Sequence, residues 1–138
     1  MTGLLLFVLL CAVLAGSEFS PNTTTIYQVT NTNDSGPGSL RDRIAAAGDG
    51  SLVTFAIFLN GSTITLTSGE IAINSNITID ASSATVPIKV TQDASFRVFH
   101  VLPGHSVTIN SLTIKGGGGV NGACILNDHA ALNLRDCV

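Results

Sequence analysis

The sequence predicts an all-β fold, a parallel β-helix with three short strands per coil and an N-terminal capping α-helix. Three observations predict it. Gly, Thr, Ser and Asn are abundant and aromatic residues make up only 5% of the chain, as is typical of short strands joined by turns. Apolar residues alternate with polar ones in short triplets, which is the pattern of a strand with one buried face. These triplets recur in groups, which indicates a repeat architecture.

The triplets fall into three groups. The steps between corresponding triplets are 35, 36 and 35 residues from the first group to the second, and 25 and 25 residues from the second to the third. Shared steps indicate that each group is one coil and that the coils differ in the length of one loop. The groups are Ile64-Thr65-Leu66, Ile71-Ala72-Ile73 and Ile77-Thr78-Ile79; then Phe99-His100-Val101, Val107-Thr108-Ile109 and Leu112-Thr113-Ile114; then Cys124-Ile125-Leu126 and Leu132-Asn133-Leu134.

Residues 60–138 are therefore predicted to be stacked coils that bury the apolar side chains of the triplets. Leu112 and Ile114 are predicted to lie in this core. Two nearly identical corners, beginning at Asn74 and Asn110, are predicted to stack, because Asn tolerates left-handed backbone and can bond its own main chain. Residues 88–90 are predicted to be only a short outlying strand.

The first 17 residues are interpreted as a signal peptide. Residues 4–16 are an unbroken apolar run that is too short to span a bilayer comfortably. The small residues Ala15, Gly16 and Ser17 suit a signal-peptidase site, although no positive charge precedes the run. The alternative is a buried or membrane-anchoring helix.

Residues 18–59 are predicted to form an N-terminal strand at 26–29, a helix and the first coil. Ser39 is the expected helix N-cap, with Asp42 three residues later as in a capping box, and Gly48 is expected to end the helix. A bare solenoid end would expose core and unpaired strand edges. The helix is therefore predicted to cover the first coil.

Charge and cysteine usage limit the classes of partner. The chain carries six Lys or Arg and nine Asp or Glu with no basic run, so nucleic acid and anionic membranes are not expected partners. His100 and His105 lack a third ligand for a metal, and no cofactor is expected. Cys124 and Cys137 either form a disulfide in an oxidising compartment or are two small buried side chains, and both alternatives stay open.

Residues 29–47, V-T-N-T-N-D-S-G-P-G-S-L-R-D-R-I-A-A-A, resemble the N-terminal segment of exported bacterial proteins of the right-handed parallel β-helix type, often named after a C-S-L-R-E-A signature. I-T-L-T-S-G-E-I-A-I, R-V-F-H-V and G-A-C-I-L-N resemble the coils of that family, and the last is similar to repeats of polymorphic outer-membrane proteins. The chain departs from the family's fuller G-G-G-I at residues 122–125. The resemblance covers roughly residues 26–138. It implies a right-handed β-helix, export and adhesin-like roles, with no catalytic residue to carry over.

Catalysis is not expected from the sequence. Hydrolysis of a polysaccharide needs two carboxylates, and no column of outward triplet residues holds two. No Asp cluster could hold calcium for a lyase. A site needs convergent groups, whereas the titratable candidates near the coils are scattered. These candidates are Asp80, Asp93, Arg97, His100 and Lys115.

We therefore expect a non-enzymatic, exported β-helix scaffold, secreted or at a bacterial outer membrane, and adhesin-like. Its expected partners are extracellular carbohydrate or a cell-surface protein, and its end could pair with a second copy, because an open solenoid end is an aggregation edge. The third group of triplets lacks its third strand, so the chain is expected to be the N-terminal part of a longer protein. The alternative function is the N-terminal segment of a pectate-lyase-like polysaccharide lyase or a glycoside hydrolase.

Overall fold

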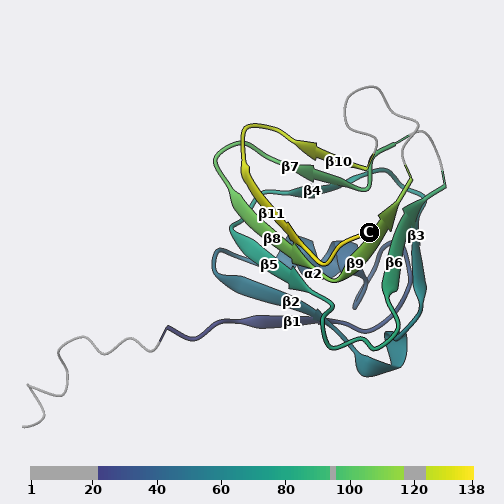
Figure 1. Cartoon of the computed structure of the whole chain (residues 1–138). Coiled ribbons are helices and arrows are strands. Elements are labelled where there is room, and N and C mark those ends of the chain that lie inside the picture. The colour runs from purple at the N-terminus through teal and green to yellow at the C-terminus, as the bar shows by residue number, and fades with distance from the viewer. Residues whose placement is uncertain (1–21, 94–95, 117–123) are drawn as a thin grey trace, which may run out of the picture.

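The computed structural model describes residues 22–93, 96–116 and 124–138. These residues form a parallel β-solenoid, in which short strands follow one another around the axis and stack into three sheets (Figure 1). The predicted signal peptide and the Gly-rich segment at 117–122 lie outside the described residues. The elements are β1 (Ile26–Val29), α2 (Leu40–Ala46), β2 (Ser51–Phe55), the 3-10 helix η1 (Ile57–Leu59), β3 (Thr63–Leu66), β4 (Ile71–Ile73), β5 (Ile77–Asp80), β6 (Ile88–Gln92), β7 (Phe99–Val101), β8 (Ser106–Asn110), β9 (Leu112–Lys115), β10 (Ile125–Asn127) and β11 (Ala131–Arg135).

The chain visits the three sheets in a fixed cyclic order. Sheet A contains β1, β2, β5, β8 and β11, sheet B contains β3, β6 and β9, and sheet C contains β4, β7 and β10. From β2 onward the path runs A, B, C three times and returns to sheet A at β11. Every pairing between neighbouring strands is parallel. Each turn of the solenoid therefore adds one strand to each sheet.

The core consists of apolar rows that run along the axis. Alternation sends every second side chain inward, and parallel in-register pairing places these side chains on one another from coil to coil. In sheet A, for example, Val53, Ile79 and Ile109 are paired neighbours, and each is fully buried. Leu112 is 1% exposed, and Ile114 is partly buried against the core. The largest fully buried side chains are Phe99, Leu40, Ile64, Leu66, Ile73, Ile79, Ile88, Ile109 and Leu112.

The register differs from the one expected from the triplets. Ile64 pairs with Val90, Ile71 with Phe99 and Ile77 with Val107, so each strand of the first group stacks one strand earlier than predicted. The cause is β6, which is not an outlying strand but the central member of sheet B. With β6 counted, equivalent positions in successive coils are 24 to 30 residues apart. The pattern thus identified the strands but assigned several of them to the wrong sheet.

The predicted stacking of Asn74 on Asn110 is wrong for the same reason. Asn110 is the last residue of β8 and pairs with Asp80 on one side and Arg135 on the other. The left-handed residue at this corner is Ser111, with a φ of 59°. Asn74 lies in the short connection that follows β4.

Two corners repeat their backbone conformation from coil to coil. Asp136 follows β11 as Ser111 follows β8, and its φ is 51°. Gly104 (φ 80°) and His129 (φ 53°) form the second pair, in which the Gly104 N–H donates to the His129 carbonyl at 3.5 Å. Left-handed backbone is costly for non-glycine residues. Successive coils that begin with β8 and β11, and those that begin with β7 and β10, therefore share these corner conformations.

The helix α2 begins at a side-chain cap. The Ser39 hydroxyl accepts a hydrogen bond from the Asp42 N–H at 3.2 Å, and the Asp42 carboxylate accepts one from the Gly38 N–H at 3.0 Å. The C-cap is Ala47, so Gly48 lies just after the cap, and the left-handed glycine of this turn is Gly50. Buried residues of α2 are Leu40 and Ile44. The helix contacts β1 and β4, the first strands of sheets A and C.

Replacing Leu112 with Asp is expected to unfold the solenoid, because it places an unpaired charge in the core between coils. The expected loss is more than about 3 kcal/mol of unfolding free energy. Circular dichroism and thermal melting would measure it. Thr113→Asp is the matched control, since Thr113 is the outward neighbour on the same strand. Equal melting temperatures for the two variants would contradict the inward and outward assignment.

Candidate functional site

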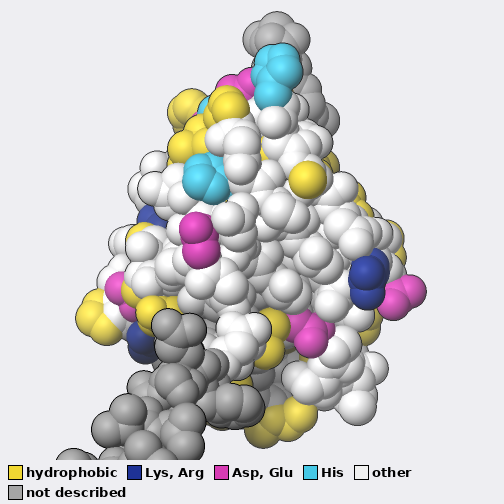
Figure 2. All heavy atoms as spheres, turned by 90° about the vertical axis from the view of Figure 1, so that its left-hand side faces the viewer, with side chains coloured by type: hydrophobic (Ala, Val, Ile, Leu, Met, Phe, Trp, Pro, Cys, Tyr) yellow, Lys and Arg dark blue, Asp and Glu magenta, His cyan; other side chains and the backbone are white. Residues whose placement is uncertain are grey.

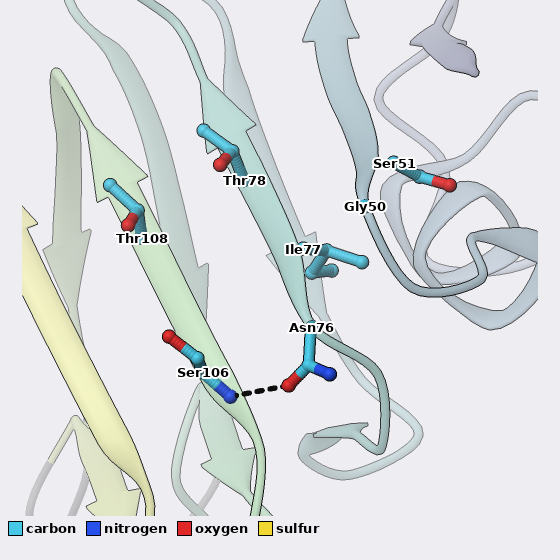
Figure 3. Close-up of a pocket in the computed structure, with 7 residues that line it drawn as sticks. All are labelled: Gly50, Ser51, Asn76, Ile77, Thr78, Ser106 and Thr108. Carbon is cyan, nitrogen blue, oxygen red and sulfur yellow. Dashed lines mark hydrogen bonds between the residues drawn. The ribbon is translucent and has the colours of Figure 1, made fainter. Parts of the chain in front are cut away.

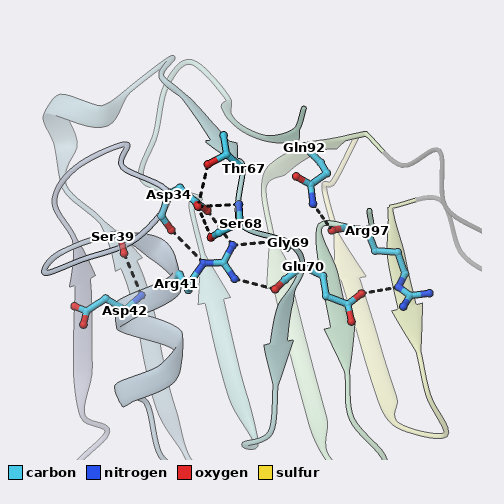
Figure 4. A network of polar contacts seen from close by, with 10 residues as sticks. All are labelled: Asp34, Ser39, Arg41, Asp42, Thr67, Ser68, Gly69, Glu70, Gln92 and Arg97. Carbon is cyan, nitrogen blue, oxygen red and sulfur yellow. Dashed lines mark hydrogen bonds and ion pairs between the residues drawn. The ribbon is translucent and has the colours of Figure 1, made fainter. Parts of the chain in front are cut away.

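The first polar cluster ties the N-terminal loop to the corner between β3 and β4 (Figure 4). The Arg41 guanidinium pairs with the Asp34 carboxylate at 2.9 Å. It also donates to the Gly69 carbonyl at 2.7 Å and to the Glu70 carbonyl at 2.8 Å. Arg41 comes from the first turn of α2 and Asp34 from the preceding loop. One side chain therefore connects the helix, the loop and the first coil.

Asp34 is the acceptor at the centre of this cluster. Its Oδ2 accepts hydrogen bonds from the Thr67 hydroxyl at 3.2 Å, the Ser68 N–H at 3.0 Å and the Ser68 hydroxyl. Partial burial opposes ionisation of this carboxyl group, but the hydrogen bond from Ser68 and the contacts with Arg41 outweigh it and lower the pKa to about 2. Asp34 is therefore ionised at neutral pH, and its carboxylate has a structural role in this cluster.

The second polar cluster crosses three successive coils beside sheet C. The Glu70 carboxylate, just before β4, contacts Arg97 Nε at 2.6 Å and His100 Nδ1 at 3.1 Å. On the other side of the same imidazole, Asp128 lies 3.8 Å from His100 Nε2. The His129 Nδ1 lies 2.7 Å from the other oxygen of Asp128. We call the residues Glu70, Arg97, His100 and Asp128 the sheet C cluster.

Two of these four residues were not predicted. Arg97 and His100 were candidates treated as scattered, whereas Glu70 and Asp128 were missed. Only the register seen in the structure would have indicated Glu70 and Asp128. In sheet C, Ala72 and Leu126 pair with His100 on either side. The assumed register instead placed Ile125 in this outward row, but Ile125 pairs with the buried Phe99.

The sheet C cluster has some of the parts of an acid and base site. Its imidazole is about 20% exposed and lies between two carboxylates. The hydrogen bond from Arg97 lowers the pKa of Glu70, burial raises it, and the hydrogen bond from His100 lowers it further; the net direction is down. Glu70 is thus a carboxylate and a hydrogen-bond acceptor for His100, which positions the ring. Within the part of the chain that the structure describes, no group of three or more His, Cys, Asp or Glu side chains could hold a metal ion.

The remaining candidates lie apart from this cluster. Asp80 points outward from sheet A, and its carboxylate accepts a hydrogen bond from the Ser82 N–H at 2.9 Å. Lys115 lies on sheet B, and Asp93 follows β6. His105 precedes β8, and its carbonyl accepts from the Ala131 N–H at 2.9 Å. The structure therefore brings Arg97 and His100 together, and it places Asp80, Asp93, His105 and Lys115 apart from them.

Cys124 and Cys137 are both free thiols in the structure. The Cys124 thiol donates to the Gly116 carbonyl at 2.9 Å, and the Cys137 thiol lies 3.3 Å from the Ile109 carbonyl. Both side chains are half-buried. Each thiol thus contacts a backbone carbonyl, and the two alternatives left by the sequence stay open.

The outer face of sheet A spans five strands, more than the faces of sheets B and C. Paired outward residues form two rows, and the side view in Figure 2 shows few charged side chains. Between β2, β5 and β8 the face has a shallow hollow of about 190 Å³, near which the Asn76 side-chain oxygen accepts from the Ser106 N–H at 2.7 Å (Figure 3). Its lining residues are Gly50, Ser51, Asn76, Ile77, Thr78, Ser106 and Thr108. The rows are Ile26, Leu52, Thr78, Thr108 and Asn133, and Gln28, Thr54, Asp80, Asn110 and Arg135.

Acid is expected to weaken the contact between the N-terminal loop and the first coil. The pKa of Asp34 is lowered in the folded state, so its stabilisation is complete above about pH 4, the ordinary range of an Asp carboxyl. It is lost as the pH falls through about 2, where folded Asp34 takes up its proton. Asp34→Asn should remove this dependence and cost about 1 to 3 kcal/mol at neutral pH.

Urea unfolding at pH 7 and at pH 3 would measure the effect. Asp93→Asn is the control, because it removes an exposed carboxyl group that follows β6 and lies outside this cluster. If Asp34→Asn loses stability on acidification as steeply as the parent chain, the acid sensitivity has another origin.

No helix among the described residues is long and apolar enough to cross a membrane. Comparison with protein-family models, with curated proteins and with solved structures finds no match to the chain. A functional proposal for the chain therefore rests on its own side chains and their arrangement.

Proposed function

We propose that the chain is a non-enzymatic, exported scaffold of the adhesin-like kind, which presents its outer sheet faces to extracellular carbohydrate or to a cell-surface protein. The observation that carries the proposal is the row of outward side chains on sheet A. Gln28, Thr54, Asp80, Asn110 and Arg135 are paired from strand to strand across five strands. All five have hydrogen-bonding side chains.

The dimensions of this row suit an extended polymer. Neighbouring strands lie about 4.8 Å apart, so five strands present polar groups over roughly 19 Å. Amide, hydroxyl and carboxylate groups can each donate to or accept from sugar hydroxyls or a peptide backbone. A flat polar row without a deep pocket favours contact along a chain over enclosure of a small molecule.

Two finer features of the scaffold belong to the same proposal. The solenoid is right-handed, as crossover connections between parallel strands of one sheet are in nearly all proteins. The helix α2 caps the first coil, which is supported by its contacts with β1 and β4 and by its buried Leu40 and Ile44. Export is supported by the apolar run at residues 4–16 and the small residues that end it.

A polysaccharide hydrolase or lyase is the second candidate, because the sheet C cluster places two carboxylates on either side of His100. A general acid needs a pKa near the working pH. Glu70 has a lowered pKa and is already paired with Arg97. The cluster therefore resembles a positioned ion-pair network more than a pair of acid and base, and binding without turnover is the favoured function.

Incubating the chain with insoluble polysaccharides would separate the two functions. We expect the chain to be retained on at least one polysaccharide while no new reducing ends or unsaturated products form. Glu70→Gln and His100→Gln should leave retention unchanged, because neither side chain belongs to the row on sheet A. Product formation that disappears in Glu70→Gln would establish the enzyme instead. No retention on polysaccharides or on cells would refute the scaffold role.

A further inference from the structure

The outer face of sheet B has an unusual composition. In one outward row Thr63, Lys89 and Thr113 are paired, and in the next row Thr65, Thr91 and Lys115 are paired. We call these six residues the Thr/Lys face. Thr63, Thr65 and both lysines are exposed, and Thr91 and Thr113 are partly exposed. Every outward position of the three strands is thus a hydroxyl or an ammonium group.

The charge of this face differs from that of the chain. The chain has a net charge of −3, yet Lys89 and Lys115 are its only lysines and both lie here. The nearest carboxylate along β6 is Asp93, which lies beyond the end of the strand. Among residues 22–93, 96–116 and 124–138, none of the six side chains makes a hydrogen bond or an ion pair. Their polar groups are available to a ligand.

Neither strand propensity nor protection of a sheet edge explains Lys89, whereas Lys115 lies on β9, an edge strand of sheet B. Threonine is favoured in exposed strands, but lysine is not. Lysine commonly protects an edge strand from pairing with other chains, whereas β6, which carries Lys89, is the central strand of sheet B. The two lysines lie on adjacent strands and in adjacent rows, so their Cα atoms are diagonal neighbours about 7 to 8 Å apart.

We propose that the Thr/Lys face binds an acidic polysaccharide, a polymer whose sugars carry carboxylates. The proposal rests on the carbohydrate-binding role proposed above and assigns it a surface and a ligand class. The ammonium groups of Lys89 and Lys115 pair with two carboxylates of the polymer. The four threonine hydroxyls, each a donor and an acceptor, bond the sugar hydroxyls between them.

Other anionic polymers fit this face less well. Affinity for DNA depends on neutralising several phosphates with as many cations, and the face has two cations. An anionic membrane is held in the same way by clusters of basic residues. A ligand with few charges and many hydroxyls matches four threonines and two lysines better than either.

The test measures binding of the full chain to polygalacturonate, with neutral dextran and a short DNA duplex as comparison ligands. The chain should bind polygalacturonate in preference to both, and binding should weaken between 50 and 200 mM salt. Lys89→Gln with Lys115→Gln should reduce affinity by about tenfold or more, since a lysine near an anionic surface contributes on the order of a fivefold effect. Arg43→Gln is the matched control, because it removes one partly exposed positive charge from α2, outside both the Thr/Lys face and the outward row on sheet A.

Each outcome decides between the proposals. Loss of binding in the double lysine variant but not in Arg43→Gln supports the Thr/Lys face. Equal weakening by Arg43→Gln, or equal affinity for the DNA duplex, would overturn it and indicate unspecific charge attraction. Binding to dextran that is unchanged in the lysine variant would overturn it while leaving the scaffold function intact. Melting curves of the variants confirm folding, and outward substitutions at these exposed positions should leave them unchanged.

Discussion

The structure depends on one constraint, that the inward side chain of each strand must lie on an apolar side chain of the coil before it. Parallel strands with a period of two satisfy it only in one register, because a slip by one residue would turn every inward side chain outward. Val53, Ile79 and Ile109 illustrate the result, a continuous apolar row that crosses three coils of sheet A. The same constraint aligns the outward residues. Polar rows on the surface are therefore a consequence of apolar rows inside.

Contacts outside the sheets add a second level of order. Arg41 joins the helix and the preceding loop to the carbonyl groups of the first coil, and the sheet C cluster joins three coils through one imidazole. Glu70, near the corner between β3 and β4, takes part in both polar clusters. Its carbonyl accepts a hydrogen bond from Arg41, and its carboxylate contacts Arg97 and His100. Glu70 therefore links the two polar clusters.

The sequence was sufficient to predict the strands but not their neighbours. Alternation of apolar residues located the strands of all three sheets, and Ser39 marked the start of the helix. The register was wrong because residues 88–90 have the same alternation as any other strand, and nothing local shows to which sheet a strand belongs. That error hid the sheet C cluster, since Glu70, His100 and Asp128 meet only when β4, β7 and β10 are placed together. It also hid the Thr/Lys face, since Lys89 belongs to the strand that was left out of the stack.

The direction of the hydrogen bonds between strands determines how the molecule would respond to a pulling force. Strands lie across the solenoid, so the bonds between them run along its axis, and each coil contacts only the coils beside it. A pull along the axis would load one row of bonds at a time, and coils would peel from an end in sequence. The contact of His100 with residues of both neighbouring coils opposes such peeling at one corner of the stack. Coils joined at this corner are therefore expected to separate under load after coils that are held by sheet hydrogen bonds alone.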